Sequence, residues 1–130
     1  NKIVRKWFSN LKEGTQLNKN LIKKINNGWM PPHTTLFIKK DLLKKIGQYD
    51  EKLKISSDYD FIIKLFREDN LKIFFLNKVT VKMRSGGISN KNIKNIFIKM
   101  SEDISIMKKY KLNIIKAILI KNLSKIKQSF

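Results

Sequence analysis

Cysteine is absent from the 130 residues of this chain. Its absence excludes a disulfide framework, a thiolate zinc site and a cysteine nucleophile. The sequence also lacks an apolar run close to the roughly 20 residues that a membrane-spanning helix needs, and no signal peptide is visible. We therefore expect a cytoplasmic protein, with peripheral contact at the inner face of the cell membrane as an open alternative.

Acidic residues are scarce, since Asp and Glu total 10 against 29 Lys and Arg, which gives a net charge of +19. Such a charge suits polyanionic partners: nucleic acid, nucleotide phosphates or an anionic membrane. Compositional drift is the favoured explanation of this charge, because Lys, Asn and Ile dominate together and arginine is found only at Arg5, Arg67 and Arg84. Neither an arginine cluster nor an aromatic stacking platform is evident. We therefore expect no specific binding of nucleic acid.

Short apolar segments between polar turns predict one domain, or part of one, of mixed α/β structure. Hydrophobic residues make up 42% of the chain, enough for a core. The predicted strands span residues 3–8, 34–38, 72–76 and 79–83. The predicted helices span residues 21–25, 41–46, 57–69, 90–109 and 114–127. Residues 10–20 are expected to form a loop, Asp41 to cap its helix, and Gly28 and Gly47 to end helices in the left-handed conformation.

Two carboxylates, Asp58 and Asp60, stand where a loop turns into the helix 57–69. A carboxylate at a helix N-terminus, in a chain poor in acids, is a candidate general base. Residues two apart point to different sides of a helix, so only one of them can face a site. Asp58 is the better candidate, while Asp60 fits a capping box with Ser57 as the N-cap. The plainer alternative is that both are first-turn acids favoured by the helix dipole.

His33 is the only histidine, and it follows Pro31 and Pro32, which restrict the backbone. Its side chain could hydrogen-bond a sugar hydroxyl or a phosphate, ligate a metal, or serve as a structural hydrogen-bonding group. The acids are too few to complete a metal site from this chain. We therefore predict no metal ligand among these residues.

A predicted strand runs into a glycine-rich loop that carries Lys82, Arg84 and Ser85. Backbone amides beside glycine, with two cations and a hydroxyl nearby, suit phosphate oxygens. The plainer interpretation is a connection between a strand and a helix. The last predicted helix is basic and amphipathic, so it either lies on an anionic membrane or packs its apolar face on the domain or on a partner.

Several segments, in this order and spacing, resemble the second half of a bacterial family-2 glycosyltransferase of the GT-A fold. The resemblance covers about residues 3–112. It rests on Gly28–Thr35 (GWMPPHTT), Phe37–Lys40 (FIKK), Gly47–Asp50 (GQYD), Ile55–Asp60 (ISSDYD) and Val81–Ser89 (VKMRSGGIS). The implied division is an acceptor-side part over residues 1–112 and a basic amphipathic helix over residues 113–130.

The resemblance implies transfer of a sugar from a nucleotide-diphospho-sugar to a hydroxyl of a glycan or lipid-linked acceptor, with inversion, in surface polysaccharide or lipopolysaccharide synthesis. The acidic motif of the family falls on Ser57-Asp58, so Asp58 would be the base; Ser57 departs from the family's usual glutamate. His33 would lie on the acceptor side, and Trp29 joins it as a predicted substrate-binding residue. Lys82, Arg84 and Ser85 would lie near the donor phosphates.

The nucleotide-binding half of the family, with its Asp-x-Asp motif for Mg²⁺ or Mn²⁺, has no counterpart before Trp29. The chain is therefore expected to be a C-terminal fragment that is inactive alone, and surface left by the missing half could drive self-association. The alternative to a transferase is a basic module that binds nucleic acid or an anionic membrane without catalysis. Such a module would bind polyanions with a steep salt dependence.

Overall fold

The computed structural model describes residues 12, 16–17, 20–82 and 92–119. Within these ranges the helices are α1 (Asn20–Asn26), α2 (Lys40–Ile46), α3 (Ser57–Phe66) and α4 (Ile93–Lys109). A single 3₁₀ turn, η1 (His33–Thr35), lies between α1 and α2. Residues 114–119 are also helical. The strands β1 (Gln16–Leu17) and β2 (Ile73–Phe74) pair antiparallel, with Gln16 opposite Phe74 and Leu17 opposite Ile73.

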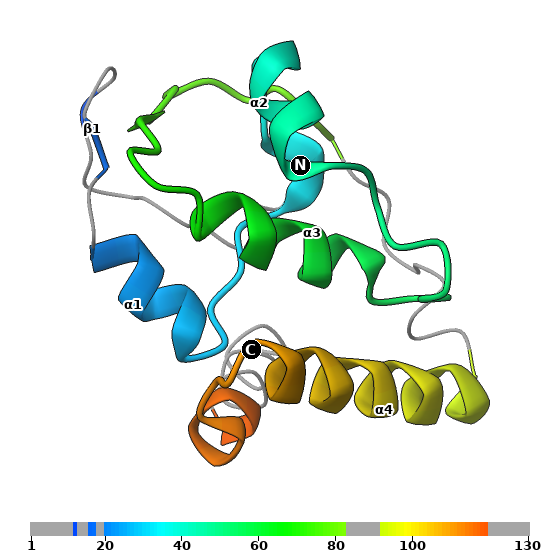
Figure 1. Cartoon of the computed structure of the whole chain (residues 1–130). Helices are drawn as coiled ribbons and strands as arrows, with labels where there is room; N and C mark the ends of the chain where they lie inside the picture. Colours follow the sequence, from blue (N-terminus) through cyan, green and yellow to red (C-terminus); the bar gives the residue numbers. More distant parts are fainter. Residues whose placement is uncertain (1–11, 13–15, 18–19, 83–91, 120–130) are drawn as a thin grey trace.

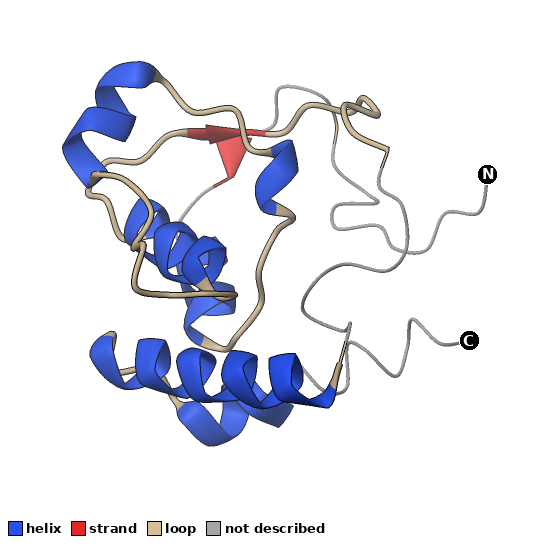
Figure 2. Cartoon of the chain, turned by 90° about the vertical axis from the view of Figure 1, so that its right-hand side faces the viewer, coloured by secondary structure: helices blue, strands red, loops and turns tan. Residues whose placement is uncertain are grey.

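Helix α3 is the centre of the fold. Its buried residues are Tyr59, Asp60, Phe61, Ile62, Ile63, Leu65 and Phe66. A helix that is apolar nearly all round is buried by its neighbours, whereas a surface helix has one apolar face. Figures 1 and 2 show α4 along one side of the molecule and α2 on the opposite side. Leu21 and Ile25 of α1 and Ile106 and Met107 of α4 complete the core around α3.

The segment after α4 returns to the same core. Leu112 and Ala117 are buried in the cluster that contains Leu21. Gly28, which has a φ of +85°, lies against Ala117 so closely that a Cβ on Gly28 would be 2.7 Å from the Ala117 carbonyl oxygen. The start of the last helix is thus packed on the end of α1, whereas Ile115 and Leu119 on the same helix are exposed.

The structure is mixed but mostly helical, so the α/β expectation holds only in its coarse form. The predicted strand 34–38 is wrong, because it begins in η1 and has no ladder partner, and no strand forms over residues 79–82. Only two residues of the predicted strand 72–76 are paired, and β1 lies in the predicted loop 10–20. Residues 3–8 and 83 lie outside the described residues. β-Branched residues favour extended backbone, but a strand exists only where a neighbour supplies hydrogen bonds.

Each predicted helix is present over its described residues, with different ends and caps. Residues 90–91 and 120–127 of the predicted helices lie outside the described residues. Lys39, and not Asp41, precedes α2, and Gly47 ends that helix with a φ of +81°. The residue before α3 is Ser56, whose side chain makes no capping bond. The capping box of Ser57 and Asp60 is therefore wrong, since Ser57 lies inside α3 and the Asp60 carboxylate binds other side chains, as described below. The N-cap of α4 is Asn92, whose side chain accepts the Asn95 N–H at 2.8 Å.

Candidate functional site

The structure brings together two residues that the sequence singles out, His33 and Asp58. Nδ1 of His33 lies 3.2 Å from Oδ2 of Asp58. The His33 side chain is 43% exposed and the Asp58 side chain 27%, so both are open to solvent and to a ligand. Oδ1 of Asp58 accepts the backbone N–H of Tyr59 at 2.8 Å. Each carboxylate oxygen therefore has one partner and keeps acceptor capacity for another donor.

A short backbone turn holds His33. The peptide oxygen of Pro32 accepts both the N–H and the hydroxyl of Thr35, at 3.0 and 2.9 Å. Proline fixes the φ angle of the residue before this turn, and Pro32 has a φ of −67°. The imidazole is thus presented from a backbone with little freedom.

Glu102 of α4 fixes the start of α3, which carries Asp58. One Glu102 oxygen accepts the N–H of Lys54 at 2.7 Å, and the other accepts those of Ile55 and Ser56 at 3.0 and 2.8 Å. A carboxylate suits backbone donors just before a helix, where the partial charge is positive. No pattern in the sequence predicts this role, because Glu102 is far along the chain in an otherwise ordinary amphipathic helix.

Asp60 is fully buried, and it is the centre of a charged cluster. Its Oδ1 accepts from Lys109 Nζ at 2.8 Å and from the Tyr110 hydroxyl at 3.0 Å, and Lys64 Nζ lies 2.9 Å from Oδ2. Burial by itself raises the pKa of Asp60, but the hydrogen bonds from Lys109, Lys64 and Tyr110 outweigh it and hold that pKa below its usual value. Asp60 therefore ties α3 to the end of α4 and does not serve as a cap.

The contact with Asp60 also shifts the pKa values of Lys109 and Tyr110. The pKa of Lys109 is raised chiefly by its hydrogen bond to Asp60. The pKa of Tyr110 is raised to about 12, first by burial and then by the hydrogen bond to Asp60. Each partner is thus kept in the protonation state that favours the cluster at neutral pH. Asp58 and Asp60, two residues apart, accordingly occupy opposite environments, one open and one enclosed.

The other predicted site residues are not all at this pair. Trp29 is partly buried and packs against the core, so its ring contributes to the scaffold. Lys82 is exposed at the end of an irregular segment. Arg84 and Ser85 lie outside the described residues. The predicted phosphate-binding group is therefore represented here by Lys82 alone.

Within the described ranges, no three His, Cys, Asp or Glu side chains lie close enough to hold a metal ion. These ranges therefore do not provide a site for the divalent ion that the resemblance implies. In the same ranges, no helix is both long and apolar enough to cross a membrane.

The chain was compared with protein-family models, with curated proteins and with solved structures, and none of the three comparisons found a match.

Proposed function

We propose that this chain is the acceptor-side part of an inverting glycosyltransferase of the GT-A type, with Asp58 as the general base. The donor is a nucleotide-diphospho-sugar, and the acceptor is a hydroxyl of a glycan or lipid-linked sugar in surface polysaccharide synthesis. Under this proposal the nucleotide-binding half, with its Mg²⁺ or Mn²⁺, belongs to a part of the protein that precedes these residues.

The observation that carries the proposal is the His33–Asp58 pair. Both residues come from segments on which the family resemblance rests, and their side chains meet at 3.2 Å on an accessible surface. A carboxylate that only caps a helix has no need of an imidazole beside it. A base that must receive a hydroxyl proton needs an open lone pair, a fixed direction and a neighbour that can hold the acceptor.

The chemistry follows from the free acceptor capacity of Asp58. Its carboxylate takes the proton of the acceptor hydroxyl while the hydroxyl oxygen bonds to the anomeric carbon. The bond from that carbon to the diphosphate oxygen breaks, and the nucleoside diphosphate leaves with that electron pair. His33 offers a hydrogen-bonding group for a neighbouring sugar hydroxyl, and Lys82 is a candidate to balance charge on the departing diphosphate.

The test is Asp58→Asn in the full-length protein, because this change is nearly isosteric and removes the base. We expect sugar transfer to fall by about 100- to 10,000-fold while binding of the nucleotide-sugar persists. Asp41→Asn is the matched control, since Asp41 is 96% exposed and its nearest cation, Lys44, is 3.9 Å away. An unchanged transfer rate in Asp58→Asn would exclude Asp58 as the base.

The competing function is a basic binding module without catalysis, which the net charge of +19 favours. The same two variants separate it from the transferase. A binding module should hold polyanions in a steeply salt-dependent way and should be indifferent to the loss of one exposed carboxylate. Absence of sugar transfer in the full-length wild-type protein, together with such binding, would favour the module.

A further inference from the structure

The first half of α4 presents an uncovered apolar face. Ile93, Ile96, Phe97 and Met100 are 73%, 42%, 68% and 51% exposed. Their spacing places them on one side of the helix, and we call these four residues the α4 apolar face. Met107, further along the same side of α4, is fully buried. The apolar side of α4 thus packs into the core near the C-terminal end of the helix and faces solvent near its N-terminal end. Contiguous exposed apolar side chains of this kind mark interaction sites.

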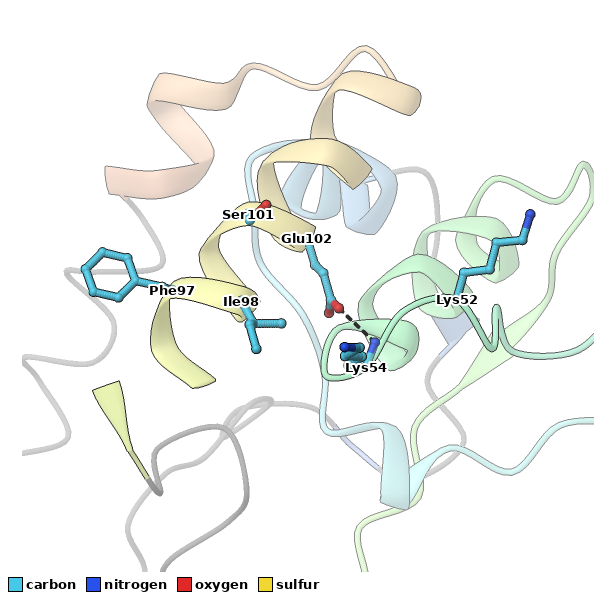
Figure 3. Close-up of a pocket in the computed structure, with 6 residues that line it drawn as sticks. All are labelled: Lys52, Lys54, Phe97, Ile98, Ser101 and Glu102. Atoms are coloured by element: carbon cyan, nitrogen blue, oxygen red, sulfur yellow. Dashed lines mark hydrogen bonds between the residues drawn. The ribbon is translucent and has the colours of Figure 1, made fainter. Parts of the chain in front are cut away.

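Exposed lysines lie near this face. Lys94 and Lys108 on α4 are exposed, as are Lys52 and Lys54 on the loop beside it. A hollow of about 430 Å³ between α4 and that loop is lined by Lys52, Lys54, Phe97, Ile98, Ser101 and Glu102. Figure 3 shows Phe97 on one side of α4 and the two lysines on the other, across Ile98.

The one acid that lines this hollow, Glu102, keeps its negative charge but is only partly exposed. Both Glu102 oxygens are taken by the N–H groups of Lys54, Ile55 and Ser56, and the dashed line in Figure 3 marks the bond to Lys54. On α4 itself, Asp103 is paired with Lys99 at 2.9 Å. Among the exposed charged side chains of α4 and this loop, lysines outnumber the one acid, Glu51, so the α4 apolar face lies beside a surface of net positive charge.

We propose that the α4 apolar face docks onto a membrane that carries anionic phospholipids. A lipid interface takes apolar side chains between its headgroups and attracts lysines through its negative charge. A second copy of this chain would bring the same charge of +19 to the contact, which opposes association. Nucleic acid would satisfy the lysines but would leave the four apolar side chains in water.

This inference does not rest on the proposed transferase activity, and it places the contact on α4 in addition to the last helix, which the sequence suggested. The test is co-sedimentation of the purified protein with vesicles of phosphatidylcholine alone or mixed with phosphatidylglycerol. We expect binding to the anionic vesicles only, and an association constant about tenfold lower in Phe97→Ser, because one aromatic side chain no longer enters the interface.

Phe37→Ser is the matched control, since Phe37 is 77% exposed and lies outside α4; it should bind vesicles like the wild type. Thermal unfolding of both variants checks that they are folded. Equal vesicle binding by Phe97→Ser and the wild type would show that charge alone drives the contact, and would overturn the proposal. So would failure to bind anionic vesicles, or a dimer in solution that Phe97→Ser dissociates, since the face would then be a contact between copies.

Discussion

Lys111 is a residue held in a conformation that suits glycine better. Its φ is +52°, and it follows α4 in a double hydrogen-bonded turn. Leu112 N–H donates to the Met107 oxygen at 2.9 Å and Lys111 N–H donates to the Lys108 oxygen at 3.0 Å. This is the Schellman arrangement, in which the left-handed residue is usually glycine. The turn directs the chain from α4 into the next helix, whose first turn Asn113 caps by accepting the Lys116 N–H at 3.1 Å.

We predict that Lys111→Gly stabilises the protein by about 1 kcal/mol, because a left-handed backbone costs an L-residue about that much and costs glycine little. Urea unfolding monitored by circular dichroism measures the change. Lys108→Gly is the matched control, since Lys108 lies inside α4, and it should destabilise by about 1 kcal/mol. A loss of stability in Lys111→Gly would show that the lysine side chain, and not the backbone, determines this turn.

At the same scale, the sequence indicated His33 and Asp58 as candidate site residues but did not indicate the contact between them. Asp58 was predicted to lie at a helix start and to be the one of the two acids that faces a site, and its side chain is 27% exposed. Its contact with His33 could not be derived, because periodicity relates neighbours along one element and says nothing about a loop residue from elsewhere. The role of Asp60 was predicted wrongly as a cap, because its partners Lys109 and Tyr110 are distant in sequence.

At the scale of elements, Glu102 links α4 to the start of α3. Glu102 supplies three acceptor bonds to consecutive backbone N–H groups. We predict that Glu102→Gln lowers the free energy of unfolding by about 1 to 3 kcal/mol, because the amide nitrogen cannot accept a hydrogen bond and the charge is lost. Hydrogen exchange at Lys54, Ile55 and Ser56 should become faster in the variant.

Glu51→Gln is the control for that change, because Glu51 is an exposed glutamate at the start of the same loop. It should leave both stability and exchange unchanged. If the three amides exchange at the wild-type rate in Glu102→Gln, then Glu102 is not what orders the loop before Asp58.

Helices were easier to predict than strands for a physical reason. A helix makes its hydrogen bonds within one segment, so apolar spacing and a terminal glycine such as Gly47 were enough to locate α2. A strand depends on a partner, and β2 is paired with β1, from a segment that reads as loop. Extended residues such as Leu36, with φ −89° and ψ 118°, have the right backbone but no ladder.

At the scale of the whole molecule, the Asp60 cluster makes the free energy of unfolding depend on pH in the acid range. The pKa of Asp60 is lowered in the fold, so its contribution is present above the pKa of an unfolded carboxyl, near 4, and is lost as the pH falls through the folded value. We predict that Asp60→Asn is less stable than the wild type by about 2 to 4 kcal/mol at neutral pH. The difference should shrink as the pH is lowered to about 3.

Urea unfolding of both proteins across this pH range gives the comparison. Asp41→Asn, at an exposed position, should follow the wild type at every pH. A difference between Asp60→Asn and the wild type that stays constant with pH would mean that the Asp60 carboxyl titrates alike in the folded and unfolded chains.

The contact of Gly28 with Ala117 has a consequence for biosynthesis. Leu21 and Ala117 belong to one core, so the α1 side of that core cannot close until the ribosome has released the last helix. At a synthesis rate of about 5 to 20 residues per second, that interval lasts about 5 to 20 seconds. During it the apolar side chains of α1 and α3 are uncovered in the nascent chain. The high positive charge of the chain opposes aggregation during that interval.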